Sequence, residues 1–223
     1  YDEEQHIANL VRNEKYTGPK PAIERIRLVP VANEDIAEAL KSGRVHLMNK
    51  VSYGKALRDL GMAAGLNKQS YPRQGMAYLG FAFESKAVSN LKVRQAVAHS
   101  INRTAIISDF LGGNGQVVNG YYGMGQWMAQ TYAKVGKEEI KGYEYNLDEA
   151  AKLLKQAGYS EKNPLKLTLL IAEGSMAGEA VAEQLKTSFE KLGAELVVDR
   201  KPWQQTLEQF YRQSPRAYDM IFM

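Results

Sequence analysis

The sequence has 223 residues, of which 44% are hydrophobic and 24% are charged, as is ordinary for a globular protein of one large or two small domains. The net charge is only +4 and the basic residues form no run or stripe, which argues against nucleic acid as a partner. Cysteine is absent, which excludes disulfides, zinc–thiolate sites, iron–sulfur clusters and thiol catalysis.

The start of the sequence fits either a processed protein or a piece of a longer one, and its end favours the second. The chain begins at Tyr1 without a signal peptide, and no run of about 18 apolar residues would span a membrane. It ends in the apolar stretch 217–223, which has the pattern of a strand, whereas natural termini are usually polar and exposed. We therefore expect the chain to be a piece of a longer protein.

Short apolar strands alternate with amphipathic helices, which predicts an α/β architecture. Asn33 is the expected N-cap of the first helix and Gly43 its end. In the first half, strands are predicted at 23–29, 45–48, 66–71 and 76–83, and further helices at 54–60, 91–101 and 103–111.

The periodicity disappears between residues 112 and 141, where glycine and aromatic residues dominate. Some 30 such residues usually form a functional loop or a segment that wraps another lobe. The aromatic side chains either pack this segment onto the domain surface or line a ligand cleft, where neighbouring methionines would tolerate varied shapes. They are Tyr121, Tyr122, Trp127 and Tyr132, interleaved with Met124 and Met128.

Regular structure is predicted again from Asn146. This residue has capping-box spacing to Glu149 and starts a helix that Gly158 ends. A βαβαβ run follows, which is typical of a parallel sheet. Its elements are strand 165–172, helix 177–192, strand 194–199, helix 203–213 and strand 217–223.

Motifs for catalysis and for metal or phosphate binding are incomplete. The three histidines, His6, His46 and His99, have no metal-ligand spacing. Around Ser175 the serine directly follows a glycine, so the nucleophile motif G-x-S-x-G is not formed. Gly120 and Gly125 have phosphate-loop spacing, but Gln126 stands where that loop needs lysine. We assign no catalytic residue, no metal site and no cofactor, and expect no enzyme.

The loop after strand 165–172 is the best candidate for a binding site. Ligands bind open α/β sheets outside the carboxyl ends of the strands. Backbone N–H groups at the following helix start, with the Ser175 hydroxyl, would suit an anion such as a carboxylate. The alternative is a simple capped turn without a ligand. The candidate residues are Glu173, Gly174, Ser175 and Met176.

Several stretches resemble, in order, the peptide/nickel family of extracellular solute-binding proteins. The clearest is 91–103, LKVRQAVAHSINR, which is similar to that family's V-R-Q-A signature and its [DN]-R ending. One departure is His46, where the family usually has aspartate. The other matching stretches are 12–16, 39–45, 78–81, 145–154 and 157–159.

The resemblance implies a lobe of the type II periplasmic-binding-protein fold, with a mixed or parallel sheet flanked by helices. Residues 1–223 would form a single lobe, the C-terminal one of two, truncated at both ends. The signature helix would be a core element with Arg94 in a structural salt bridge or capping carbonyls. Its core-facing residues would be Val93, Ala96, Val97 and Ile101.

The same resemblance implies a substrate-binding component of an ABC importer. It would capture an oligopeptide or a related small polar solute between this lobe and a missing first lobe, and present it to a membrane permease. The protein would be exported, at the cell surface as a lipoprotein or in the periplasm. Receptors for nickel chelates, opines or oligosaccharides, and a ligand sensor without transport, remain alternatives. Glu173–Met176, with Tyr121, Tyr122 and Trp127, are the expected ligand-binding residues.

Overall fold

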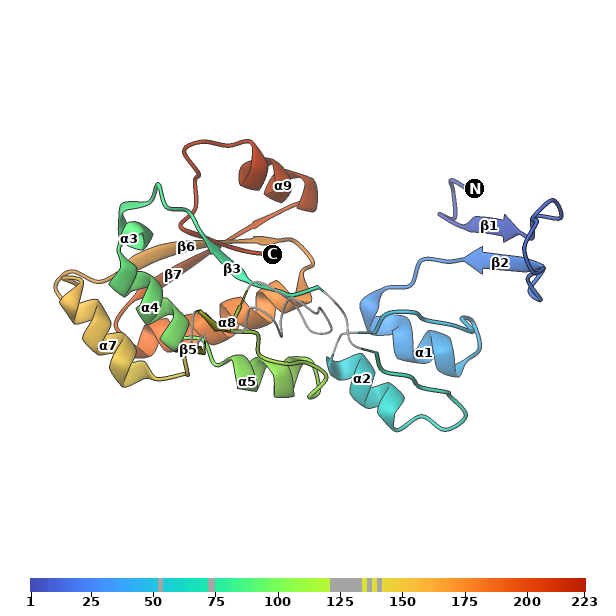
Figure 1. The fold of residues 1–223 in the computed structure, drawn as a ribbon, viewed down its shortest axis with the longest axis horizontal. Coiled ribbons are helices and arrows are strands. Elements are labelled where there is room, and N and C mark those ends of the chain that lie inside the picture. Colours follow the sequence, from blue (N-terminus) through green and yellow to red (C-terminus); the bar gives the residue numbers. More distant parts are fainter. Residues whose placement is uncertain (52–53, 72–74, 121–133, 136–137, 140–141) are drawn as a thin grey trace. The chain divides into compact units, whose positions relative to one another are not determined.

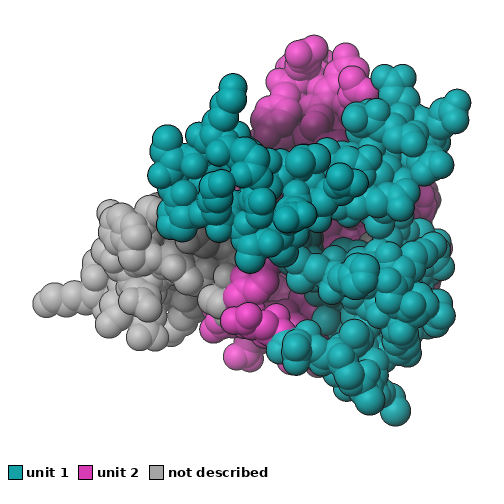
Figure 2. Space-filling view, turned by 90° about the vertical axis from the view of Figure 1, so that its right-hand side faces the viewer, with its two compact units in different colours: residues 1–68 teal, residues 69–223 magenta. Residues whose placement is uncertain are grey.

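The protein is described by a computed structural model that covers residues 1–51, 54–71, 75–120, 134–135, 138–139 and 142–223. Its chain forms two compact units, residues 1–68 and 69–223 (Figure 2), and we describe each by itself. The single lobe expected over residues 1–223 stays a prediction.

The first unit combines a hairpin with two short helices. Strands β1 (Ala8–Val11) and β2 (Arg25–Leu28) pair antiparallel. A 3₁₀ turn, η1 (Asn33–Asp35), leads into α1 (Ile36–Lys41), and α2 (Gly54–Gly61) follows. A small core joins the two helices through Ile36, Ala37, Ala56 and Leu60.

Three predictions for this region are wrong. The first helix does not start at an Asn33 cap, because η1 begins after Ala32 and α1 after Asp35. Neither 45–48 nor the described residues of 66–71 form a strand. Leu47 is 80% exposed, so the apolar residues of 45–48 do not pack as one buried face of a sheet would.

The second unit is built on a four-stranded mixed sheet in the order β3-β8-β6-β7 (Figure 1). The strands are β3 (Leu79–Phe81), β6 (Lys166–Ala172), β7 (Glu195–Lys201) and β8 (Met220–Phe222). β6 runs parallel to both β7 and β8, as the βαβαβ pattern predicts. β3 pairs antiparallel with β8 at the edge and is shorter than the predicted strand 76–83.

Helices cover the two faces of this sheet unequally. Figure 1 shows α4, α7 and α8 on one face and α9 on the other. The predicted helix 103–111 is a turn of α-helix followed by a π-helix. The helical elements are α3 (Lys86–Ser89), α4 (Leu91–His99), α5 (Arg103–Ala105), η2 (Ile106–Phe110), α7 (Leu147–Gln156), α8 (Met176–Lys191) and α9 (Trp203–Tyr211). Strands β4 (Lys134–Val135) and β5 (Glu138–Glu139) form a separate short pair.

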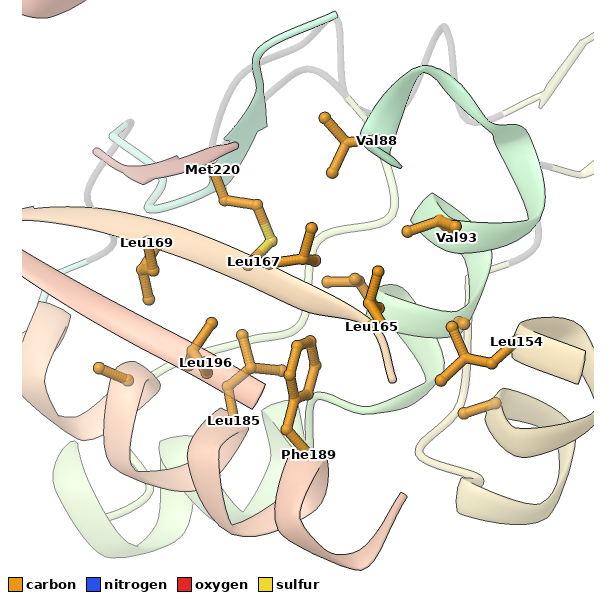
Figure 3. Close-up of a cluster of buried hydrophobic side chains, with 14 of the residues drawn as sticks. Val88, Val93, Leu154, Leu165, Leu167, Leu169, Leu185, Phe189, Leu196 and Met220 are labelled. Atoms are coloured by element: carbon orange, nitrogen blue, oxygen red, sulfur yellow. The ribbon is translucent and has the colours of Figure 1, made fainter. Parts of the chain in front are cut away.

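The main core lies between the sheet and the α4–α7–α8 face (Figure 3). Alternate residues of one strand point to the same side, so Leu167, Leu169 and Ile171 of β6 all face these helices. From α4, Val93, Ala96 and Val97 are buried against them, and Ile101 packs at the margin, as the resemblance implied.

Arg94 of α4 caps carbonyl groups, which confirms one of its two expected roles. Its Nη1 donates to the carbonyl oxygens of Val88 and Ser89, both at 2.8 Å. The guanidinium also lies 4.7 Å from the ring centroid of Phe83, within the range of a cation–π contact. Arg94 therefore fixes the turn between β3 and α4.

Asp219 connects three strands of the sheet. Its Oδ2 accepts a hydrogen bond from the backbone N–H of Thr168 in β6, at 2.6 Å, and its Oδ1 accepts one from the Ser85 hydroxyl. Its backbone carbonyl accepts from the N–H of Ala82, just after β3, at 2.9 Å. A residue at the start of β8 thus sets the positions of β3 and β6.

We predict that Asp219→Asn lowers the free energy of unfolding by about 2 kcal/mol, because the Thr168 N–H and the Ser85 hydroxyl lose a charged acceptor, and hydrogen bonds to a charged group are stronger than those to a neutral amide. Urea unfolding followed by circular dichroism measures the change. Asp199→Asn is the matched control, since Asp199 pairs with Lys201 at 3.2 Å near the surface and its loss should change stability by less than about 1 kcal/mol. Equal effects of both substitutions would contradict this account.

Candidate functional site

The carboxyl ends of β6, β7 and β8 meet at one edge of the sheet because these strands are parallel. Such an edge is where open α/β sheets bind ligands. The turn at residues 173–175 joins the end of β6 to α8 at this edge. We define this turn, with Met176, as the binding-edge turn. It contains the four candidates Glu173, Gly174, Ser175 and Met176.

Backbone hydrogen bonds hold the binding-edge turn against both neighbouring elements. The N–H of Glu173 donates to the carbonyl of Lys201 at the end of β7, at 2.8 Å. The N–H of Ser175 donates to the carbonyl of Ala172 at 3.1 Å, which closes a tight turn. Gly174 has φ of +72°, in the region where glycine avoids the strain that a side chain would cause.

The Ser175 side chain caps α8. Its Oγ accepts a hydrogen bond from the N–H of Gly178 at 3.1 Å, as in the capped-turn alternative. A Cβ at Gly178 would lie 2.9 Å from that oxygen and 3.3 Å from the Phe222 ring, so glycine allows the helix start to approach β8. Among described residues, the N–H groups of Met176 and Ala177 have no acceptor. Free N–H groups at the start of a helix are able to bind an anionic group.

The charged groups around the edge are largely paired with one another. Arg200 donates from Nε and Nη2 to the two carboxylate oxygens of Glu179, both at 2.7 Å. These hydrogen bonds lower the pKa of Glu179 and raise that of Arg200. The Glu173 side chain is exposed. Within the described residues, the edge therefore offers hydrogen-bond donors and, at Glu173, a carboxylate without an ion pair.

The structure brings the four loop candidates together in one turn. Glu173 and Gly174 are exposed, and Ser175 and Met176 are partly buried. The aromatic candidates Tyr121, Tyr122 and Trp127 lie outside the described residues. A role in ligand binding stays a prediction for all seven.

Two further properties concern the part of the chain that the structure describes. There, no group of three or more His, Asp or Glu side chains is arranged to hold a metal ion. No helix within the same ranges has the length and apolar character needed to cross a bilayer.

Sequence reasoning missed a cluster that joins residues 118–119 to residues 142–144, which we call the neck. Arg103 lies at its centre, with Nη1 donating to the Val118 carbonyl at 3.3 Å and to Asn119 Oδ1 at 3.0 Å. Its Nη2 donates to the Tyr143 carbonyl at 2.5 Å. Burial lowers the pKa of Arg103, because the charged form loses solvation.

His99 and Gly142 complete the neck. The ring Nδ1 of His99 lies 2.7 Å from the Glu144 carbonyl, and its ring meets that of Tyr143 edge to face at 5.2 Å. A side chain at Gly142 would collide with that of Asn119. The acceptors are mostly backbone carbonyls, which any residue type provides. The identities of these residues therefore could not predict the hydrogen bonds of the neck.

We predict that Ser175→Ala lowers the free energy of unfolding by about 1 kcal/mol, because the N–H of Gly178 loses its cap. Ser175→Asp keeps an acceptor and should retain most of the stability. Thermal unfolding of the three proteins measures both changes. Equal losses in the two variants would show that the hydroxyl does not act as a cap.

We predict that Arg103→Ala speeds amide hydrogen exchange at residues 116–119 and 143–146, because three hydrogen bonds of the neck are lost. Arg103→Lys should be intermediate, since a single ammonium cannot reproduce the guanidinium fork. Lys92→Ala, which removes one exposed hydrogen bond to Gln156, is the control and should leave these rates unchanged. Unaltered exchange in Arg103→Ala would argue against the clamp.

Comparisons with known proteins agree with this architecture. The oligopeptide-binding protein AppA of Bacillus subtilis is 24% identical over 222 residues, which cover 90% of this chain and 38% of that protein. The nickel-binding periplasmic protein of Escherichia coli is 26% identical over 205 residues, covering 84% of this chain and 37% of that protein. The chain thus spans less than two-fifths of the length of these relatives.

The fold of this chain also resembles the folds of solved structures. The periplasmic binding protein DppA of Helicobacter pylori, in complex with the peptide STSA, superposes with a TM-score of 0.75 at 22% identity. The match covers 98% of this chain and 40% of that one. The fold is therefore that of type II periplasmic binding proteins, with a mixed sheet flanked by helices.

The family assignment comes from a match along the whole sequence. The family model described as "Bacterial extracellular solute-binding proteins, family 5 Middle" matches residues 1–223. The binding-edge turn and the signature helix α4 both lie within it. This chain belongs to the family 5 bacterial extracellular solute-binding proteins.

Proposed function

We propose that this chain is part of the substrate-binding component of an ABC importer that captures oligopeptides. The observation that carries the proposal is the binding-edge turn, where the N–H groups of Met176 and Ala177 are free among described residues and Glu173 is exposed. A carboxylate or carbonyl of a ligand would accept from these N–H groups, and Glu173 would attract a ligand cation. A peptide carries all of these groups.

The proposed mode of action is binding without chemistry. The ligand lies between this lobe and a second lobe of the same protein, and a hinge motion closes the two around it. Hydrogen bonds to the peptide backbone, partly through water, accept many sequences because the backbone is common to all of them. Tyr121, Tyr122 and Trp127 would offer aromatic faces to variable side chains.

The other proposed partners follow from this role. A membrane permease receives the ligand from the closed protein, so the protein acts outside the cytoplasmic membrane, at the cell surface or in the periplasm. The family description and the periplasmic relative from E. coli support that location.

A nickel chelate is the second candidate ligand. It is favoured by the resemblance to the nickel-binding periplasmic protein of E. coli. A chelate brings its own donors to the metal and presents carboxylates outward, which the free N–H groups of Met176 and Ala177 would also bind.

Native mass spectrometry of the protein, purified from its host without denaturation, tests the ligand class. We expect a heterogeneous set of co-purified short peptides. A single metal chelate or another single non-peptide mass would keep the transport role and overturn the peptide assignment. A protein that repeatedly purifies without ligand, and binds none from a peptide mixture, would oppose both.

We predict that residues 1–223 alone bind peptides with a Kd weaker than about 1 μM, because one lobe buries the ligand from one side only. Isothermal titration with a peptide found in the native protein measures this. In the natural protein, Glu173→Gln should weaken binding of that peptide with no change in melting temperature. Glu190→Gln, at an exposed position farther along α8, is the matched control. Equal affinities of the two variants would remove Glu173 from the site.

A further inference from the structure

The charged side chains at the carboxyl end of β7 form two ion pairs, one on each face of the sheet. Val198 packs against the main core under α8, so the alternation of the strand places Arg200 on that face as well. There Arg200 binds both carboxylate oxygens of Glu179 at 2.7 Å. The same alternation places Asp199 on the other face, where its Oδ2 lies 3.2 Å from Lys201 Nζ. In each pair the positive charge offsets the negative one.

Glu173 lies at the same edge without such a partner. Its side chain is exposed, and within the described residues its carboxylate has no ion pair. Its backbone N–H donates to the carbonyl of Lys201, which places the turn beside the end of β7. The Lys201 ammonium, however, is held by Asp199. Glu173 therefore contributes a negative charge with which no described side chain pairs.

The backbone acceptors around Glu173 are already in use. The Lys201 carbonyl accepts from the N–H of Glu173 at 2.8 Å and from the Thr206 hydroxyl at 3.1 Å. The Ala172 carbonyl accepts from the N–H of Ser175. The amino terminus of a peptide has three N–H donors next to its own backbone, and its capture needs several fixed acceptors. A single exposed carboxylate instead suits the charged end of a long, partly hydrated side chain.

We propose that Glu173 selects peptides that carry a lysine or arginine side chain after their first residue. The inference rests on the proposed peptide-binding function and adds the charge class of the ligand. The carboxylate attracts an ammonium or guanidinium group and repels an acidic side chain at the same position of the peptide. Because the contact is exposed, the preference is modest, about fivefold between lysine and glutamine. Salt weakens it, since exposed charges are screened.

A library of random peptides, three to eight residues long, tests this preference with the natural protein. The protein is equilibrated with the library and separated by gel filtration, and the bound peptides are sequenced by high-resolution tandem mass spectrometry. We expect lysine to be enriched about fivefold over glutamine after the first residue, glutamate to be depleted, and both effects to shrink at about 0.5 M salt. Bound peptides without lysine enrichment would overturn this inference alone. A protein that retains no peptide would overturn the proposed function and this inference with it.

Substitutions at position 173 show whether this residue causes the selection. Glu173→Gln should abolish the lysine enrichment, and Glu173→Lys should replace it with an enrichment of glutamate. Glu190→Gln, at an exposed position farther along α8, is the matched control and should leave the enrichment unchanged. An enrichment that survives Glu173→Gln would assign the selection to another residue, and the proposal would fail.

The ion pair between Arg200 and Glu179 provides a test of opposite sign. Arg200→Gln leaves the Glu179 carboxylate without its cation, so the lysine enrichment should rise above that of the unsubstituted protein. Arg200→Gln combined with Glu179→Gln removes both charges and should return the enrichment to its original value. Enrichment is a ratio, so a general loss of affinity does not change it. An unchanged or lower enrichment in Arg200→Gln would contradict an electrostatic origin of the selection.

Discussion

The carboxylate of Asp219 fixes the position of β8, a short strand between β3 and β6. β6 and β7 pair at seven positions, whereas β8 pairs with β6 at only two. Its three-residue ladder with β3 is extended by backbone hydrogen bonds of Tyr78 and Ala82. Ladders this short are marginal without further contacts. Because Asp219 receives hydrogen bonds from both Ser85 and the backbone of Thr168, β8 cannot slide by one residue without breaking a bond to a charged group. That register determines how the carboxyl end of β8 is aligned with the carboxyl ends of β6 and β7.

The binding edge that results is already hydrogen-bonded in most places. The Ser175 hydroxyl caps α8, Glu173 is tied through its backbone to β7, and Glu179 is paired with Arg200. The groups that remain for a ligand are therefore few and fixed in position. Fixed donors lose little conformational entropy on binding, so even a small number of them can contribute usefully to affinity.

Sequence reasoning was most accurate where the sequence has a helix cap or a long stretch of regularly spaced apolar residues. Asn146 and Ser175 begin α7 and α8 within one residue of the predicted starts, and β6 fills seven of the eight predicted positions. It was wrong at 45–48, where four residues with some apolar side chains are largely exposed and form no strand. The binding-edge turn was predictable from strand order alone. The links through Asp219 and Arg103 were not, because most of their partners are backbone groups distant in sequence.

The neck has a consequence for how family members could diverge. Arg103 and His99 hold residues 118–119 beside residues 142–144, and Asn146 bonds through its N–H to the carbonyl of His99. The scaffold of α4, α5 and α7 is thus joined through the neck. The acceptors at Val118, Tyr143 and Glu144 are backbone carbonyls, so a change of side chain at these three positions leaves the hydrogen bonds of the neck in place. Family members could then differ at these positions while the sheet and its binding edge stay in place.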